Sequence, residues 1–163
     1  MPIYKVQKVP LISQPTDGVC WYACCRMLYK WSQATGQGSM INPADDPGFH
    51  QRFLDNGSWF CGDNKFMAST LSMNLVSSLS MDYDSLSSFM AAHGPIFASV
   101  QKNWGANNYP HAIVICGAAD TGVFIHDSMP LRTASSYWLT WGQIQRGLDG
   151  VADVANPPFM TAV

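Results

Sequence analysis

Charged side chains are scarce in this sequence of 163 residues: Lys, Arg, Asp and Glu together make up 12% of it, against about 25% in a typical soluble domain. The nine basic residues are scattered along the chain, and the formal net charge is −2. A surface that binds several phosphates needs Lys and Arg gathered on one face. The composition therefore indicates that nucleic acid is not a partner.

Long apolar runs are also absent. No segment approaches the roughly 18 uninterrupted apolar residues that cross a bilayer, and the opening MPIYKVQKVP has no apolar stretch of the kind found in a secretory signal. We therefore expect a soluble protein without a membrane partner. The missing signal is expected of a cytoplasmic protein, of a protein exported by a route that needs no such signal, or of a domain excised from a larger protein.

A disulfide framework is not indicated either, because five cysteines is an odd number. Cys20, Cys24 and Cys25 crowd one helical turn, where they do not suit a set of paired bridges. Disulfides persist in oxidising compartments, so this pattern favours a reducing one. At least one thiol is expected to be free.

Apolar residues are plentiful by comparison. They make up 47% of the chain, which at this length is enough for one hydrophobic core without support from disulfides or metals. The sequence shows no internal repeat. We therefore expect a single domain over residues 1–163.

The first half of the chain predicts helices. Weaker helical patterns lie at about residues 47–56, 64–75 and 84–92, the last with Asp84 as its N-cap. The strongest pattern precedes them and is an apolar stripe at helical spacing, formed by Cys20, Ala23, Cys24, Met27, Leu28 and Trp31.

The second half predicts strands. Residues 95–100, 111–118, 122–128 and 135–140 are rich in β-branched and aromatic types and are separated by turn residues. They predict an antiparallel sheet. Helices followed by strands are typical of the α+β class, here with a helical lobe, a sheet lobe and a site between them.

The position of Cys20 suggests a nucleophile. A helix that begins near this residue places its thiol among unpaired N–H groups, at the positive end of the helix dipole. Such surroundings can lower a thiol pKa from about 8.5 to between about 3.5 and 7.5. Cys24, one turn further on, is interpreted as core, and Cys25 as a small residue on the helix flank. The alternative for Cys20 is a buried small hydrophobe without chemistry.

Two residues of a predicted hairpin give Cys20 its partners. His111 opens one strand and Asp127 ends the next, with a turn near residues 119–122 between them. Folding at that turn sets the two side chains nearly opposite each other, within about one residue of register. The carboxylate can then orient the imidazole, which can deprotonate Cys20 and later protonate a leaving amine. For either residue taken alone, a structural role is the better interpretation: a hydrogen-bonded histidine at a strand end for His111, and a turn residue for Asp127.

Gln14 supplies a candidate oxyanion donor. It lies six residues before Cys20, so its amide can fold back beside the Cys20 N–H. The other histidines, His50, His93 and His126, are interpreted as structural or exposed.

A zinc site is weakly supported. It would use Cys20, Cys24, Cys61 and a histidine, but the paired C-x₂-C spacing of zinc sites is missing. We predict no metal and no other cofactor.

The run from Gln14 through CWYACCRML, followed later by HGPIFASV, HAIVICGA and VFIHDSMP, resembles the papain-like cysteine peptidases of bacteria. It looks most like AvrRpt2-type secreted effector proteases and the bacteriocin-processing peptidase domains of ABC transporters, over residues 5 to about 130. The resemblance implies a papain-like two-lobed fold with Cys20 as nucleophile, His111 as base and acid, Asp127 as orienter and Gln14 in the oxyanion hole. The DSMP segment departs from the DP that is usual in similar proteins.

We therefore expect a cysteine endopeptidase that cleaves polypeptides through a thioester acyl-enzyme. The resemblance implies a bacterial effector or toxin domain that acts in the reducing cytosol of a target cell and has a cognate immunity protein. An amidase or deamidase acting on peptidoglycan stems or glutamine side chains would use the same groups. A non-catalytic binding module could also retain the fold.

Three further residues are predicted to bind substrate. Trp104 and Gly105 lie in the loop before His111, and Trp21 is next to Cys20. The competing interpretation of a tryptophan is packing in the core or beneath a loop.

Overall fold

The computed structural model describes residues 2–58, 63–155 and 157–163. Its described helices are α1 (Cys20–Thr35), α2 (Pro47–Leu54), α3 (Asn64–Leu71), α4 (Tyr83–His93) and α5 (Trp141–Asp149). Its described strands are β1 (Ile3–Lys5), β2 (Asn74–Val76), β3 (Ile96–Lys102), β4 (Tyr109–Ala119), β5 (Gly122–Asp127), β6 (Ser135–Thr140) and β7 (Phe159–Thr161). The predicted α+β class is confirmed.

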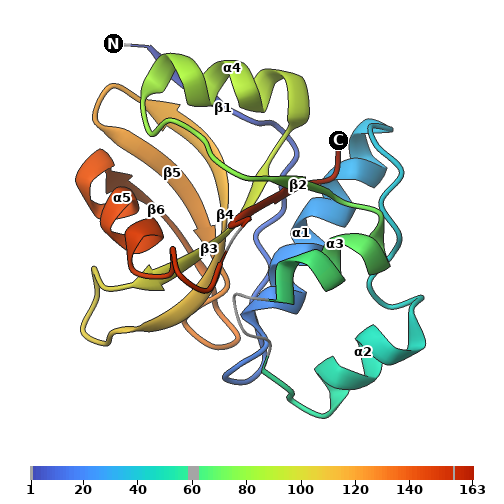
Figure 1. Cartoon of the computed structure of the whole chain (residues 1–163). Coiled ribbons are helices and arrows are strands. Elements are labelled where there is room, and N and C mark those ends of the chain that lie inside the picture. Colours follow the sequence, from blue (N-terminus) through green and yellow to red (C-terminus); the bar gives the residue numbers. More distant parts are fainter. Residues whose placement is uncertain (1, 59–62, 156) are drawn as a thin grey trace.

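The strands form one sheet in the order β2-β7-β3-β4-β5-β6, and each pair along it is antiparallel (Figure 1). β4 is the longest strand and organises the sheet. Its first part, Tyr109 to Ile115, pairs with β3, and its last part, Gly117 to Ala119, pairs with β1. The four predicted strands are thus the consecutive strands β3 to β6, while β1, β2 and β7 are three-residue strands, too short to show a periodic pattern.

Helices cover both faces of the sheet. Side chains alternate along a strand, so neighbouring residues of β3 pack on different helices. On β3, Phe97 packs with α1 and α3, whereas Ile96 and Ala98 pack with α4 and α5. The chain therefore does not place all helices before all strands. α4 and α5 lie across the sheet from α1, and α5 follows the strands β3 to β6 in the chain.

The apolar stripe of α1 lies in the core as predicted. Cys24, Met27 and Leu28 are fully buried, and the helix ends at Gly36 in a left-handed conformation. Cys25, interpreted as a small residue on the helix flank, is also fully buried. The sheet covers α1 on one side, and α2 and α3 cover it on the other.

α4 begins earlier than predicted. Its N-cap is Asp82, whose carboxylate accepts a hydrogen bond from the Ser85 N–H at 2.8 Å. Asp84 instead lies in the first turn, where its charge faces the positive end of the dipole. Within the three described ranges of the chain, no helix is both long and apolar enough to cross a membrane.

Gly94 is the C-cap of α4, and its backbone has a conformation that favours glycine. It has φ +75° and ψ −157°, its N–H donates to the Met90 carbonyl at 2.8 Å, and a Cβ here would overlap the buried Trp31 indole. Gly36 also has a positive φ, +68°, but a Cβ there would meet nothing within 4 Å.

We expect Gly94→Ala to lower the free energy of unfolding by about 3 kcal/mol, because backbone strain and overpacking add. Gly36→Ala is the matched control and should cost about 1 kcal/mol, the strain alone. Urea unfolding followed by circular dichroism measures both. Equal losses would contradict the packing of Gly94 against Trp31.

Candidate active site

The nucleophile candidate Cys20 is the first residue of α1. The residue before it, Val19, has no polar side-chain atom to cap the helix. The half-buried thiol instead accepts hydrogen bonds from the backbone N–H groups of Trp21 and Ala112. The structure thus places the sulfur at the positive end of the helix dipole, as the sequence predicts.

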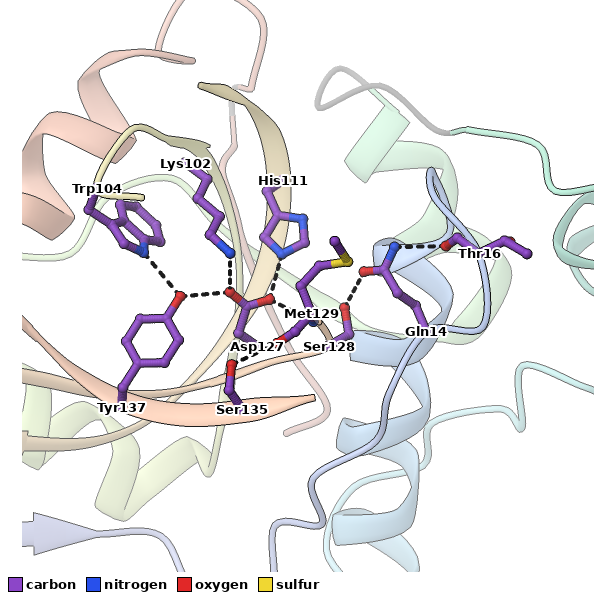
Figure 2. A network of polar contacts seen from close by, with 10 residues as sticks. All are labelled: Gln14, Thr16, Lys102, Trp104, His111, Asp127, Ser128, Met129, Ser135 and Tyr137. Atoms are coloured by element: carbon purple, nitrogen blue, oxygen red, sulfur yellow. Dashed lines mark hydrogen bonds and ion pairs between the residues drawn. The ribbon is translucent and has the colours of Figure 1, made fainter. Parts of the chain in front are cut away.

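His111 lies beside Cys20. Its imidazole faces the Asp127 carboxylate on its other side (Figure 2). The imidazole is hydrogen-bonded to the Cys20 sulfur, and its Nε2 donates to Asp127 Oδ1 at 2.7 Å. Both His111 and Asp127 are buried, Asp127 completely. The three predicted residues therefore form one continuous chain of contacts, sulfur to imidazole to carboxylate.

The register of the β4–β5 hairpin differs from the prediction in detail. Val114 pairs with His126 and Ile115 with Ile125, so the continued register sets Asp127 opposite Ile113. His111 is therefore the diagonal neighbour of Asp127, two residues away rather than about one. A β-bulge between Ile115 and Gly117 produces this register.

Asp127 is saturated with hydrogen bonds. Its Oδ1 accepts from His111 and from the Met129 N–H at 2.9 Å. Its Oδ2 accepts from Lys102 Nζ at 2.7 Å and from the Tyr137 hydroxyl at 2.6 Å. Burial alone would raise the pKa of Asp127, but hydrogen bonds and charge from His111 and Lys102 hold it well below its usual range.

Opposite charges also shift the other two groups. Burial would raise the pKa of Cys20, but the hydrogen bond and charge of His111 outweigh it and lower this pKa below its ordinary value. Burial would lower the pKa of His111, but Asp127 and Cys20 together raise it to about 9. These shifts favour a thiolate beside an imidazolium near neutral pH.

Gln14 is buried beside the end of β5. Its amide nitrogen donates to the Thr16 carbonyl at 2.9 Å, and its amide oxygen accepts from the Ser128 hydroxyl at 2.5 Å. Its backbone N–H also donates to the Ser128 carbonyl at 3.1 Å. Ser128 thus fixes both the position and the orientation of Gln14.

A pocket of about 490 Å³ brings these groups together. Its walls come from the loop before α1, the loop before His111 and the segment after Asp127. They comprise Gln14, Asp17, Gly18, Cys20, Asn107, Asn108, Tyr109, Pro110, His111 and Met129. Cys20, His111 and Gln14 thus share one pocket.

The predicted substrate-binding residues lie elsewhere. Trp21 is 1% exposed, and its indole N–H donates into the backbone, to the Gly18 and Gly57 carbonyls at 2.9 and 3.1 Å. The Trp104 indole N–H donates to the Tyr137 hydroxyl at 3.0 Å. Neither tryptophan lines the pocket, and both indoles make the packing and loop-anchoring contacts of the competing interpretation. Gly105 lines a neighbouring pocket of about 310 Å³ that shares Asn107, Tyr109 and Met129 with the first.

Sequence reasoning missed Lys102, Ser128 and Tyr137. Ser128 had the clearest signal, because it follows Asp127 directly. Lys102 is the last residue of β3 and pairs with Tyr109, which lies two residues before His111. Asp127 pairs with Ser135, and Tyr137 lies two residues after Ser135 on the same strand. Strand alternation thus puts Tyr137 on the face of Asp127, but only once the register is known.

The remaining histidines have structural partners. His50 shares a hydrogen bond of 2.6 Å with the Tyr22 hydroxyl, and His93 Nδ1 donates to the Val163 carbonyl at 3.0 Å. His126 contacts the Val9 carbonyl at 3.1 Å and the Ser136 hydroxyl at 2.8 Å. Among the described residues, no group of three or more His, Cys, Asp or Glu could hold a metal ion. Cys61 of the alternative zinc set lies outside the described residues.

A family model described as papain-like cysteine protease AvrRpt2 matches residues 3–138. The chain belongs to this family. The match covers every residue of the pocket and the resemblance predicted from its motifs is confirmed. No curated protein matches the sequence.

In this AvrRpt2-type protease, Cys20 differs from the other described thiols. Cys24, Cys25 and Cys116 are buried free cysteines, and burial raises the pKa of each, that of Cys116 to about 12. Such thiols stay protonated and are poor nucleophiles. The family's chemistry requires a reactive cysteine, and Cys20 alone of these four is half-exposed with a lowered pKa.

We expect iodoacetamide to alkylate Cys20 of the native protein long before Cys24, Cys25 or Cys116. Because thiolate is the reacting form, the rate should rise through a midpoint below the ordinary thiol pKa of about 8.5. His111→Ala should move that midpoint to higher pH, since the stabilising imidazolium is lost. Site-resolved mass spectrometry follows each cysteine. Alkylation of Cys116 at the rate of Cys20 would contradict this account.

Proposed function

We propose that the protein is a cysteine endopeptidase that cleaves polypeptides through a thioester acyl-enzyme formed on Cys20. The observation that carries this proposal is the chain of contacts from Cys20 through His111 to Asp127, in one pocket with Gln14. In this proposal residues 1–163 form a single papain-like domain. Its helical lobe is built on α1 and its sheet lobe on β3 to β6, with the pocket between them.

The first step forms the acyl-enzyme. The Cys20 thiolate, whose proton resides on His111, attacks the substrate carbonyl carbon and forms a C–S bond. The tetrahedral intermediate then expels the amine as its C–N bond breaks, and the His111 proton passes to the leaving nitrogen. A thioester and a neutral imidazole remain.

The second step releases the acyl group. Neutral His111 accepts a proton from water as the water oxygen attacks the thioester carbonyl. Collapse of the intermediate breaks the C–S bond and restores the thiolate–imidazolium pair. Asp127 keeps the imidazole oriented throughout, because its Oδ1 holds the ring nitrogen that does not face the sulfur.

Gln14 is the proposed oxyanion donor. A primary amide nitrogen carries two hydrogens, and one of those on Gln14 is directed to the Thr16 carbonyl. The second can donate into the pocket that Gln14 and Cys20 share. Together with the Cys20 N–H at the start of α1, it gives two donors for the developing negative charge.

Membership of a protease family favours polypeptides over the other substrates considered. An amidase or a deamidase would use the same catalytic groups and differ only in the pocket walls. The intact set of Cys20, His111, Asp127 and Gln14 speaks against a module that only binds. The effector or toxin role, action in a reducing cytosol and a cognate immunity protein belong to this proposal, supported by the family and by the four described free thiols.

We expect the wild-type protein, added to a cell lysate, to create new protein N-termini that Cys20→Ala does not create. Labelling of N-termini followed by mass spectrometry measures them. Cys20→Ala is a suitable control because alanine removes the sulfur and keeps the helix start. Identical N-termini in both samples, with release of muropeptides or conversion of Gln to Glu, would replace the endopeptidase with an amidase or deamidase.

We expect Gln14→Ala to lower kcat by about 10²- to 10³-fold, because one oxyanion donor is lost. KM should change little, since the ground-state carbonyl needs this donor less than the oxyanion does. Alkylation of Cys20 by iodoacetamide forms no oxyanion and should stay at the wild-type rate, which controls for damage to the site. An unchanged kcat would remove Gln14 from the mechanism.

A further inference from the structure

Asp127 is held on both of its oxygens, and the two sides differ in character. Oδ1 faces His111 and the backbone N–H of Met129, whereas Oδ2 faces Lys102 and Tyr137 (Figure 2). A carboxylate offers about four acceptor sites, so the four donors use them all. The carboxylate can therefore neither rotate nor shift without losing a charge-assisted hydrogen bond.

Charge makes the Oδ2 side essential to the proposed cycle. Asp127 is completely buried, and a buried carboxylate is costly unless a cation pairs with it. While His111 is protonated, Asp127 has two cationic partners. Once the imidazole has given its proton to the leaving amine, Lys102 is the cation that still pairs with Asp127, at 2.7 Å.

We propose that Lys102 is a positioning residue, whose ammonium neutralises the buried Asp127 carboxylate and so lets His111 release its proton in each turnover. This inference rests on the proposed function for its catalytic meaning. The electrostatic part of the inference is that a cation sets the affinity of His111 for its proton. This part depends only on the geometry of the described residues.

Tyr137 and Trp104 complete the arrangement around the carboxylate. The Tyr137 hydroxyl donates to Asp127 Oδ2, and the Trp104 indole donates to the same hydroxyl oxygen at 3.0 Å. The hydroxyl proton is thereby committed to Asp127. Trp104 lies close to α5, since a Cβ on Gly147 would be 3.0 Å from its ring. This assigns Trp104 to support of the site and explains why it does not line the pocket.

The described ionisable groups around this centre come from four elements. β3 contributes Lys102, β6 contributes Tyr137, and the Lys102 ammonium also lies 5.7 Å from the ring of Tyr109 on β4. The hydroxyl of Tyr137 stays neutral at working pH, because burial and then Asp127 raise its pKa to about 12. The charges or titratable groups that bear on His111 and Asp127 are thus Cys20 and Cys24 on α1, Lys102, Tyr109 and Tyr137.

The sign of the effect follows from these charges. Removing the Lys102 ammonium leaves the Asp127 charge less compensated, so the imidazolium is held more firmly and the pKa of His111 rises. A cation within hydrogen-bonding distance of the shared carboxylate should change that pKa by about one unit. Lys102→Arg keeps the charge and should restore the wild-type value.

The test measures His111 directly. In a Cys20→Ala background, NMR follows the imidazole signals of His111 against pH for proteins with Lys102, Lys102→Met and Lys102→Arg. We expect a rise of about one pH unit for Lys102→Met and little change for Lys102→Arg. An unchanged His111 titration in folded Lys102→Met protein would overturn the proposal. If circular dichroism shows that this variant does not fold, Lys102→Gln replaces it under the same criterion.

Kinetics with intact Cys20 give the second readout. For Lys102→Met, the alkaline limb of kcat/KM against pH should move up with the His111 pKa, and kcat should fall at least about tenfold as proton release slows. A fall in kcat with an unmoved limb would assign Lys102 a structural role only and would overturn the proposal. Absence of peptidase activity in the wild type would overturn the proposed function, while the NMR titration would still decide the role of Lys102.

Discussion

One extra residue in β4 decides which face of the sheet Asp127 occupies. Counting back from the turn, where Ala119 pairs with Gly122, an unbroken register would set Asp127 opposite Val114. Val114 packs toward α1, on the face away from Ile113. The bulge between Ile115 and Gly117 shifts the register by one, which sets Asp127 opposite Ile113 and on the face of His111. The imidazole–carboxylate contact and everything that depends on it require this irregularity.

The consequences extend to the electrostatics of the whole centre. On the correct face, Asp127 enters a fully buried position where water cannot solvate it. Protein groups must then stabilise its charge. The strands on either side of the β4–β5 pair supply two of them, Lys102 from β3 and Tyr137 from β6. Burial strengthens each of these interactions because it removes the screening of water. The same burial makes the loss of one partner costly.

The second half of the site is held by the segment after Asp127. Ser128 binds Gln14 through both its backbone and its hydroxyl, and Met129 forms part of the pocket wall. In the DSMP segment, Ser128 stands where the proline of the usual DP would be, and it positions Gln14. The loop before α1 and the end of β5, more than a hundred residues apart, are thereby fixed against each other.

How far the sequence could predict this arrangement depends on the range of each interaction. The start of α1, the burial of Cys24 and the two strands that carry His111 and Asp127 follow from local periodicity and turn residues. The bulge leaves no such trace, so the register could be predicted only to within about one residue. Lys102 and Tyr137 reach Asp127 across strand pairs and are invisible without that register. Trp21 and Trp104 were assigned by proximity along the chain, which says little about where a large side chain packs.

The place of β7 has a consequence for how this protein matures. Residues 159–161 lie between β2 and β3 within the sheet, and Met160 packs in the same cluster as Cys24, Met27 and Leu28 of α1. β2 joins the sheet through β7, so the helix that presents the sulfur has no complete support until this late segment has been synthesised and inserted. A chain in which β7 has not yet been inserted therefore lacks both the strand that holds β2 in the sheet and a side chain of the cluster that packs α1.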